Sequence, residues 1–224
     1  IIKIFLLMTS ILFGISSIID TPNIPFNYSH IRSVFTRDER FEQTKNTINS
    51  IRKYCPDAKI FIIECSNYET NKSQLDYLKE NSDYFINIWD KIELHQYIFS
   101  ISKTLGACTM FFELINYIIQ NKLLFDNYFF MSGRYYLTDK FNFDLYKDAK
   151  ILQFKTDGIH TSTILYKFNY DYLCLYKEHL IANFNPNLSY EDIYRIFCEN
   201  NKEAVTELIK DGYEGYIAVD GNKI

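Results

Sequence analysis

The stretch "DNYFFMSGRYYLTDKF", residues 126–141, decides the fold and raises the question of function. Its apolar part, residues 127–132, is rich in aromatic residues and does not alternate with polar ones, which is typical of a strand buried on both faces. The strand ends on Ser132, Gly133 and Arg134. Arginine stays charged in proteins, so a cation at the end of a buried strand needs a partner.

Outward from this strand, apolar runs of strand length alternate with segments of helical spacing. This alternation predicts a mainly parallel sheet whose strands are joined by crossover helices. In the first helical segment, Thr36 is the expected N-cap and Glu39 its capping-box partner. The strand segments are residues 58–65, 84–89 and 127–132, and the helical segments are residues 37–54, 73–82 and 100–124.

The second half of the sequence is less regular, but it contains no linker, repeat or low-complexity stretch. We therefore expect residues 1–224 to form one α/β domain, with a mostly parallel, Rossmann-like sheet, flanking helices and a helical C-terminal part. The two candidate strands of this half could pair antiparallel at a sheet edge. The candidate strands are residues 149–155 and 161–168, the helical segments residues 170–184 and 189–211, and the closing hairpin residues 212–224.

The first twenty residues form an apolar run. Lys3 followed by this run resembles a signal peptide, but no clean small-x-small cleavage site follows, and the apolar span is short for a membrane helix. The run is rich in β-branched and aromatic residues, so we predict a buried first strand that ends at Thr9 and Ser10, and no stable membrane span. A signal or anchor segment at the N-terminus stays open.

Composition and charge argue against two classes of function. The formal net charge of −4 does not supply the basic surface that nucleic-acid binding requires. The four histidines lack zinc-ligand spacing, and the five scattered cysteines are typical of reduced thiols in a cytoplasmic protein. Aromatic residues make up 17% of the sequence, and they could either build a core or stack on sugars and bases.

Polar side chains follow several predicted strands at their carboxyl ends. In an open parallel sheet, ligands bind beyond these ends. The residues that this rule selects are Thr9 and Ser10 after the first strand, Glu64 and Ser66 after the second, and Ser132, Gly133 and Arg134 after the strand quoted above.

Arg32, Arg37 and Arg40 cluster near the start of the first predicted helix. Guanidinium groups and a helix N-terminus both favour a phosphate-bearing ligand, so we include Arg32 and Arg37 in the candidate site. The alternative is that neighbouring carboxylates pair with these arginines on a solvated face, and it applies more to Arg40 than to Arg32. The carboxylates concerned are Asp38, Glu39 and Glu42.

Lys103 and Gly106 lie one turn apart at the start of the long helical segment. A lysine there could reach a phosphate, and the glycine would let a ligand or another backbone approach. A solvated lysine and a packing glycine are the alternative. Glycine inside a helix costs about 1 kcal/mol relative to alanine, which favours a specific reason for Gly106.

Four segments together carry a resemblance to a known family: "RSVFTRDERFEQTKNTINSIRKYCPDAKIFIIECS" (residues 32–66), "SKTLGA" (residues 102–107), "FFMSGRYYL" (residues 129–137) and "YEGYIAVDG" (residues 213–221). They are similar to an uncharacterised glycosyltransferase-like group of viruses and bacteria with the GT-A, or nucleotide-diphospho-sugar transferase, fold. A viral member would act in the host cytoplasm.

The resemblance implies glycan biosynthesis, with a sugar moved from a UDP-, GDP- or CMP-sugar donor to a glycan or glycoprotein acceptor. It implies a nucleotide-binding half, residues 1–137, and an acceptor-side half, residues 138–224. In that fold the first two strand ends hold the nucleoside, a later helix carries a basic residue and a glycine, and a buried strand ends on a metal-binding D-x-D motif.

The sequence departs from this pattern where the D-x-D motif belongs. Divalent cations bind clustered carboxylates, and a guanidinium would repel them. We expect Arg134 to neutralise the diphosphate leaving group, Gly133 to allow close backbone approach, and transfer to need no metal cofactor, with Mn²⁺ or Mg²⁺ less favoured. Two alternatives remain: a displaced metal site at Asp126, Asp139 and Asp144, or a structural ion pair of Arg134 with Glu64 or Glu113.

An inverting transfer also needs a base that takes the acceptor hydroxyl proton. Asp157 and His160, on an expected loop before a strand, are the candidates for this role. Glu191 is assigned instead to the N-terminal turn of a helix after Ser189. A retaining mechanism would leave the choice of base open.

Two other functions fit the same fold. A nucleotidyltransferase would need a glycine-rich, basic loop after the first strand, and "TSILFGISSIIDTP", residues 9–22, is poor in glycine and has no basic residue. A non-catalytic carbohydrate- or nucleotide-binding domain would also lack the D-x-D motif, so it stays the main alternative.

Overall fold

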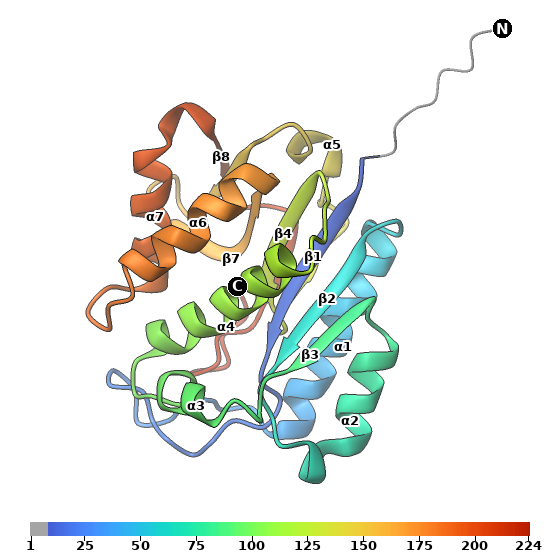
Figure 1. The fold of residues 1–224 in the computed structure, drawn as a ribbon, viewed down its shortest axis with the longest axis vertical. Helices are drawn as coiled ribbons and strands as arrows, with labels where there is room; N and C mark the ends of the chain where they lie inside the picture. Colours follow the sequence, from blue (N-terminus) through green and yellow to red (C-terminus); the bar gives the residue numbers. More distant parts are fainter. Residues whose placement is uncertain (1–8) are drawn as a thin grey trace, which may run out of the picture.

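A seven-stranded sheet runs through the centre of the protein in the order β3-β2-β1-β4-β7-β6-β8 (Figure 1). The computed structural model describes residues 9–224. The strands are β1 (Ile11–Ser17), β2 (Lys59–Glu64), β3 (Tyr84–Asn87), β4 (Asn127–Ser132), β6 (Ile151–Lys155), β7 (Thr161–Phe168) and β8 (Val205–Ile209).

The strand pairing confirms the predicted α/β fold with a mostly parallel sheet. The β1–β2, β2–β3, β1–β4 and β6–β8 pairs are parallel, whereas β7 is antiparallel to β4 and β6. The register sets Ser16 opposite Ser132, and Ser17 opposite Glu64. The carboxyl ends of β1, β2 and β4 therefore meet at one edge of the sheet.

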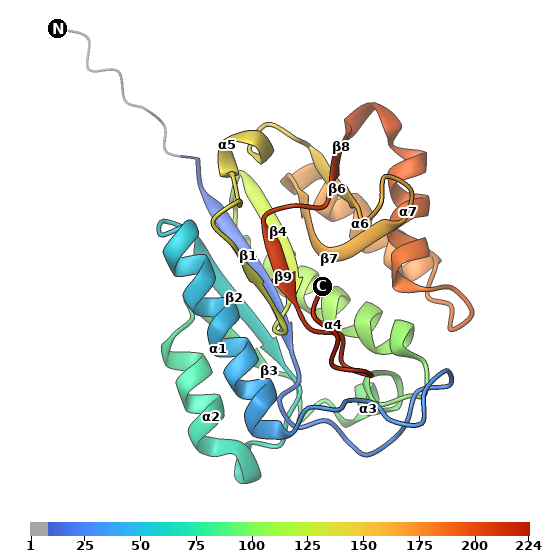
Figure 2. The same ribbon diagram turned by 180° about the vertical axis from the view of Figure 1, so that it is seen from behind.

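Helices cover both faces of this sheet. Seen from opposite sides, α4, α6 and α7 lie over one face, and α1 and α2 lie over the other (Figures 1 and 2). The helices are α1 (Arg37–Tyr54), α2 (Tyr68–Glu80), α3 (Ile92–Ile98), α4 (Lys103–Gln120), α5 (Phe143–Tyr146), α6 (Tyr170–Ala182) and α7 (Tyr190–Asn200). None of the helices within residues 9–224 is both long and apolar enough to cross a bilayer.

The predicted start of α1 is confirmed. The Thr36 hydroxyl accepts a hydrogen bond from Glu39 N at 3.3 Å, and the Glu39 carboxylate accepts one from Thr36 N at 2.8 Å. This capping box satisfies donors that a helix otherwise leaves free at its N-terminus. The predicted N-terminal turn of a helix after Ser189 is also confirmed: Ser189 is the N-cap of α7, and its side chain accepts a hydrogen bond from Asp192 N.

The prediction for the first strand is wrong in its position. Within the described residues the strand is β1, which pairs with both β2 and β4, because residues 11–15 supply an unbroken apolar run for a position in the middle of the sheet. The expected strand over residues 1–8 lies outside the described residues. Thr9 and Ser10 therefore precede β1 at the amino edge, where Ser10 N and Oγ donate to Asp126 at 2.7 and 2.8 Å.

The end of the chain also differs from prediction. The segment predicted as one helix over residues 189–211 ends as α7 at Asn200, and β8 follows, because its Val, Thr and Ile residues pair with β6. The predicted closing hairpin is present in part, with Tyr216 bridged to Lys223. Its first residues form an unpredicted ribbon, in which β9 (Tyr213–Gly215) pairs with β5 (Tyr135–Leu137) against α1 (Figure 2).

Aromatic residues build the core on both faces of the sheet. Phe13 of β1 stacks on Phe129 of β4 with ring centroids 4.9 Å apart, and Phe130 stacks on Tyr166 at 5.5 Å. The buried Tyr166 and Tyr190 hydroxyls lie 2.7 Å apart, so each has a polar partner inside the core. Much of the aromatic content therefore serves packing.

One buried charge in the core makes stability depend on pH. Burial lowers the pKa of Lys167 to about 8, although its Nζ donates to the Lys147 and Ala149 carbonyl oxygens. In the unfolded chain a lysine has a pKa of about 10.4. Between these two values the unfolded chain binds a proton that the folded chain has lost, so the contribution of Lys167 to stability rises with pH.

We therefore predict that the unfolding free energy of the wild type rises relative to Lys167→Met between pH 7.5 and pH 9.5. Denaturant unfolding of both proteins at the two pH values measures the difference. Lys79→Met, which removes an exposed lysine of α2, serves as the control and should follow the wild type. Parallel profiles for the wild type and Lys167→Met would contradict the prediction.

Candidate functional site

A cavity of about 380 Å³ opens at the carboxyl edge of the sheet. The ends of β1 and β4 form its floor, where Ser16 and Ser132 lie side by side. Its walls come from the β1–α1 loop (residues 18–36), the first turns of α4 and α7, β7 and the segment that follows β9. Both halves of the chain therefore contribute to one concave site, as is usual for a ligand pocket.

Arg134 lines this cavity, directly after β4. Its Nε is buried and has no hydrogen-bond partner among the described residues. Neither carboxylate proposed as a structural partner forms an ion pair with it: Glu64 is engaged by Ser66 and backbone amides, and Glu113 pairs with Lys91 at 2.5 Å. A buried donor without a partner is costly, which indicates a site for an anionic ligand.

The segment after β9 holds the backbone of Arg134. Tyr216 N donates to the Arg134 carbonyl oxygen at 3.4 Å, and Gly215 pairs with Tyr135. A Cβ at Gly215 would lie 2.5 Å from the Arg134 oxygen, so only glycine allows this approach. The side chain of Arg134 is thus presented to the cavity from a backbone fixed on both sides.

Arg40 is a second guanidinium in the cavity wall, and the sequence analysis did not select it for the site. Its Nε donates to the Ile18 carbonyl oxygen at 2.7 Å and its Nη1 to Ser33 Oγ at 3.3 Å. Burial, and then the nearby charge of Arg134, lower the pKa of Arg40 to about 9, so it is charged at neutral pH. These two like charges in the cavity wall repel each other, and an anion bound near both would relieve the repulsion.

Arg32 also lines the cavity, but most of its donors bind the protein itself. Its Nε donates to the Ile24 oxygen at 2.9 Å, and its Nη atoms donate to the carbonyl oxygens of Ile98 and Ser100. The guanidinium lies 4.4 Å from the centre of the Phe26 ring. Arg32 therefore ties the β1–α1 loop to the end of α3, and it adds positive charge to the cavity.

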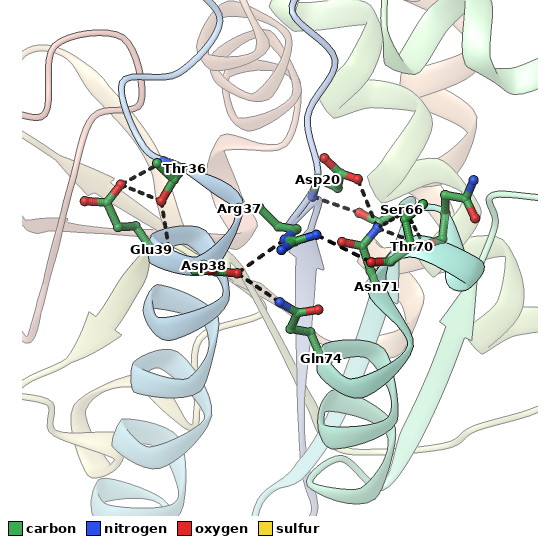
Figure 3. A network of polar contacts seen from close by, with 10 residues as sticks. Asp20, Thr36, Arg37, Asp38, Glu39, Ser66, Thr70, Asn71 and Gln74 are labelled. Carbon is green, nitrogen blue, oxygen red and sulfur yellow. Dashed lines mark hydrogen bonds and ion pairs between the residues drawn. The ribbon is translucent and has the colours of Figure 1, made fainter.

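The structure places Arg37 away from the cavity, contrary to expectation. Its Nε contacts Asp38 at 3.3 Å and its Nη1 donates to the Thr70 oxygen at 3.4 Å, so it joins α1 to α2 (Figure 3). The N-terminus of α1 is closed by the capping box of Thr36 and Glu39, visible in the same view. Neither Arg37 nor this helix end is positioned for a phosphate in the cavity.

Glu64 and Ser66, predicted to hold the nucleoside, lie behind the cavity wall. The Glu64 Oε1 accepts from Ile19 N at 3.1 Å and from Ser66 Oγ at 2.6 Å, and burial raises its pKa. Ser66 Oγ in turn accepts from Asp20 N at 3.0 Å (Figure 3). Both residues fix the path of the β1–α1 loop as it leaves the sheet, and neither lines the cavity.

Lys103 and Gly106 both line the cavity at the start of α4. Lys103 Nζ lies 3.9 Å from Glu191 Oε1 of α7. A Cβ at Gly106 would lie 2.9 Å from the Ile98 carbonyl oxygen, so the glycine serves the approach of another backbone. Of the two reasons considered for this glycine, close backbone packing is the one that the structure supports.

Gly133 serves packing of α1 and does not line the cavity. A Cβ there would lie 2.6 Å from Thr44 Oγ1. Thr44 Oγ1 also donates to the Gly133 oxygen at 3.3 Å and lies 3.1 Å from Ser17 Oγ. The expected role of Gly133 in ligand approach is therefore replaced by a role in seating α1 on the ends of β1 and β4.

Asp157 and His160 lie on the predicted loop, between β6 and β7, but outside the cavity lining. The Asp157 carboxylate accepts hydrogen bonds from the backbone N of His160 at 2.9 Å and from the His160 ring Nδ1 at 2.8 Å. These bonds hold the pKa of Asp157 well below its usual range. The His160 side chain is 77% exposed. The loop ends Thr156 and Thr161 do line the cavity, so the predicted base lies near the site without reaching it.

Glu191 is the acidic residue that the sequence analysis set aside and that the structure brings to the cavity. It lies in the first turn of α7, as predicted, and Thr163 Oγ1 of β7 donates to its Oε1 at 3.0 Å. The helical spacing of the sequence predicted this turn. Its packing against β7 is a contact between residues far apart in the chain, and no local sequence pattern predicts it.

An aromatic pair on the β1–α1 loop also lines the cavity. The Phe26 and Tyr28 rings lie 5.4 Å apart with an interplanar angle of 8°, and 58% of Tyr28 is exposed. Burial of the remainder raises the pKa of Tyr28, and the charge of Lys103 opposes this rise. A flat, partly exposed aromatic surface next to cations is suited to stacking with a base.

The alternative of a displaced metal site finds no support in the described residues. Asp126 lies at the amino edge with Ser10, and Asp144 pairs with Lys147 at 2.8 Å. Across residues 9–224, no three His, Cys, Asp or Glu side chains gather in a group that could hold a metal ion.

Comparison with known proteins gives the fold a name. No protein-family model and no curated protein matches the chain. A protein from Desulfovibrio desulfuricans G20 assigned as a nucleotide-diphospho-sugar transferase is similar in structure, with a TM-score of 0.50 and 11% identity over 90% of this chain and 79% of the other. The protein therefore has a GT-A-like, nucleotide-diphospho-sugar transferase fold.

Two further structures are similar at a lower level. The 4-diphosphocytidyl-2C-methyl-D-erythritol synthase of Anaerococcus prevotii DSM 20548 gives a TM-score of 0.49 and 11% identity, over 91% of this chain and 88% of the other. Mouse xyloside xylosyltransferase 1 gives 0.45 and 9% identity, over 89% and 84%.

The contact between Gly133 and Thr44 leads to a prediction about stability. Gly133→Ala should lower the unfolding free energy by about 1–3 kcal/mol, because the added methyl group overpacks the seat of α1. In a Thr44→Ala background the clashing oxygen is absent, so the same substitution should cost clearly less. Denaturant unfolding of the four proteins measures this coupling.

Thr44→Ser keeps the oxygen and serves as the matched control, in which Gly133→Ala should retain most of its cost. An equal cost of Gly133→Ala in all three backgrounds would show that Thr44 does not limit the space at this strand end.

Proposed function

We propose that the protein transfers a sugar from a nucleotide-sugar donor to a glycan or glycoprotein acceptor without a bound metal ion. The buried, unpartnered Nε of Arg134 at the end of β4 carries this proposal. The GT-A-like fold agrees with a nucleotidyl- or glycosyl-transfer enzyme, and the cavity supplies the reason to prefer sugar transfer.

The charge of the cavity fits a diphosphate. Among the described residues that line it, four are basic and one is acidic. They are Arg32, Arg40, Lys103 and Arg134, against Glu191. A guanidinium binds phosphate oxygens through two parallel N–H donors, and such charge-assisted bonds are among the strongest in proteins. The cavity volume of about 380 Å³ is in the range of small-molecule sites.

The two halves of the chain receive different roles in this proposal. Residues 1–137 supply Arg40, Arg134 and the Phe26–Tyr28 pair, so we assign the diphosphate and the base to this half. Residues 138–224 supply the β7 wall and the start of α7, so we assign the acceptor to that half.

The chemical work of Arg134 would be electrostatic. When the bond between the anomeric carbon and the phosphate oxygen breaks, negative charge grows on the leaving diphosphate. A guanidinium placed at this strand end would stabilise the charge, as a divalent cation does in D-x-D enzymes. Arg40 and Lys103 would also stabilise the negative charge of the diphosphate, and the residue nearer to the phosphates would contribute more.

A non-catalytic nucleotide- or carbohydrate-binding domain is the alternative function. The missing D-x-D motif after β4 favours it, because loss of a metal site also accompanies loss of catalysis. A nucleotidyltransferase is less favoured, since the β1–α1 loop, residues 18–36, contains no glycine.

A thermal-shift screen separates these functions. A UDP-, GDP- or CMP-sugar at about 100 times its Kd should stabilise the protein by about 2.7 kcal/mol, which raises Tm by about 5–10 °C. The shift should be the same in EDTA and in Mn²⁺. No shift with any nucleotide sugar would contradict the proposal, and a shift that needs Mn²⁺ would contradict its metal-independent form.

Arg134→Ala tests the residue directly. We expect nucleoside diphosphate affinity to fall about 10- to 100-fold, since one charge-assisted contact is lost, and donor turnover to fall further. Calorimetry and nucleotide-release assays measure the two effects. Arg37→Ala, which removes an arginine that faces α2, is the matched control and should change neither. Loss of the folded state in Arg134→Ala would instead assign the arginine a structural role.

A further inference from the structure

The wall of the cavity opposite the nucleotide half carries hydroxyl groups of β7 to which no individual role has been assigned above. Thr161, Ser162 and Thr163 are consecutive in β7, and all three line the cavity. Because side chains alternate along a strand, Thr161 and Thr163 share the face on which Thr163 binds Glu191, and Ser162 lies on the opposite face, where it binds Tyr213. Glu191 follows from α7, bound to Thr163. Thr161 and Ser162 are 9% and 4% exposed, so this wall is part of the body of the protein.

Each of these hydroxyls is oriented by neighbouring groups and keeps one hydrogen-bonding function free. Thr161 Oγ1 accepts a hydrogen bond from Gln153 Nε2 at 2.9 Å. Ser162 Oγ accepts from the Tyr213 hydroxyl at 3.0 Å and from Ile164 N at 3.4 Å, so both O–H groups are free to donate. Thr163 Oγ1 donates to Glu191, so its oxygen is free to accept. Sugar hydroxyls, which both donate and accept, match such a wall.

Glu191 is oriented in the same way. Both of its polar contacts fall on one carboxylate oxygen: Thr163 Oγ1 lies 3.0 Å and Lys103 Nζ 3.9 Å from Oε1. Among the described residues, no contact engages Oε2, and the side chain is 39% exposed at the cavity. The second oxygen is therefore free to accept a hydrogen bond from a ligand hydroxyl.

We propose that Glu191 and the β7 hydroxyls form the acceptor subsite, that the acceptor is a neutral polyhydroxylated sugar, and that Glu191 is the catalytic base. This inference rests on the proposed sugar transfer. Lys103 lies next to the Glu191 carboxylate and offsets its charge, so the carboxylate offers little attraction to a cationic acceptor. An anionic acceptor would be repelled by the same carboxylate. A neutral acceptor is the chemistry that the wall satisfies.

The step balances as follows in atoms and charge. The acceptor oxygen forms a bond to the anomeric carbon of the donor, and its proton passes to Glu191 Oε2. The bond between the anomeric carbon and the phosphate oxygen breaks, and its electron pair leaves with the nucleoside diphosphate, whose charge Arg134 and Arg40 neutralise. No oxidant, reductant or metal ion is required.

Glu191→Gln tests the inference with water as the acceptor, by release of nucleotide from UDP-glucose, GDP-mannose and a CMP-sugar. A general base contributes about 100- to 10,000-fold, so kcat should fall at least about 100-fold, while the Kd for UDP or GDP stays within about twofold. Glu199→Gln, on the exposed side of α7 where Glu199 pairs with Arg195, is the matched control and should keep the activity of the wild type.

The pH profile gives a readout that a purely structural role would not move. In the wild type kcat should fall toward acid pH as the base becomes protonated, and Glu191→Gln should lose this acid limb. Glu191→Asp, which keeps a carboxylate, should regain part of the rate. Saturation-transfer NMR with UDP present should detect glucose or galactose, but not glucuronate, and the signal should be lost in Thr161→Val/Ser162→Ala.

The outcomes separate the two levels of the proposal. If the wild type turns over a donor and Glu191→Gln keeps both its rate and its acid limb, Glu191 is not the base and this inference is overturned. Glucuronate binding as strong as glucose binding overturns the assignment of a neutral acceptor. If the wild type binds or turns over no nucleotide sugar, the proposed function itself fails.

Discussion

The buried Nε of Arg134, which has no protein partner among the described residues, is the constraint on which the site depends. Arg134 follows the central strand β4, and its Nε has no acceptor among the described residues. The backbone around it is fixed by Gly133 against Thr44 and by Gly215 and Tyr216. A buried polar atom without a partner costs free energy, and an anion that accepts a hydrogen bond from this Nε would remove that cost.

The rest of the cavity agrees with that requirement. Arg40 adds a buried guanidinium to the same wall, and Lys103 adds a further charge at the start of α4. The phenol of Tyr28 stacks on Phe26 at one side, and the β7 hydroxyls and Glu191 lie at another. Cations, a flat aromatic surface and a wall of neutral hydroxyls lie in one cavity of about 380 Å³, and the proposed binding of a nucleotide sugar and its acceptor rests on this combination.

The sequence predicted what is local and failed where contacts are distant. The capping box at Thr36 and the alternation of strands and helices are local patterns, and both are confirmed. The first strand was misplaced because one apolar run spans more than a strand, and hydrophobicity alone does not mark where pairing with β2 and β4 begins. The strand-end rule correctly selected Arg134 for the cavity, and positive charge near a helix start correctly selected Lys103 and Arg32. The same charge criterion failed for Arg37, which faces α2. Glu191 was missed because only the packing of α7 on β7 brings it to the site.

The most direct test of the account is a crystal structure of the protein with UDP or GDP, grown in EDTA. The account predicts that the Arg134 Nε and an Nη atom donate to phosphate oxygens at about 2.7–2.9 Å, with no cation between them. A divalent ion bridging the two phosphates in a crystal that requires it, or an Arg134 side chain turned away from the bound diphosphate, would contradict the claim that this arginine takes the place of a metal.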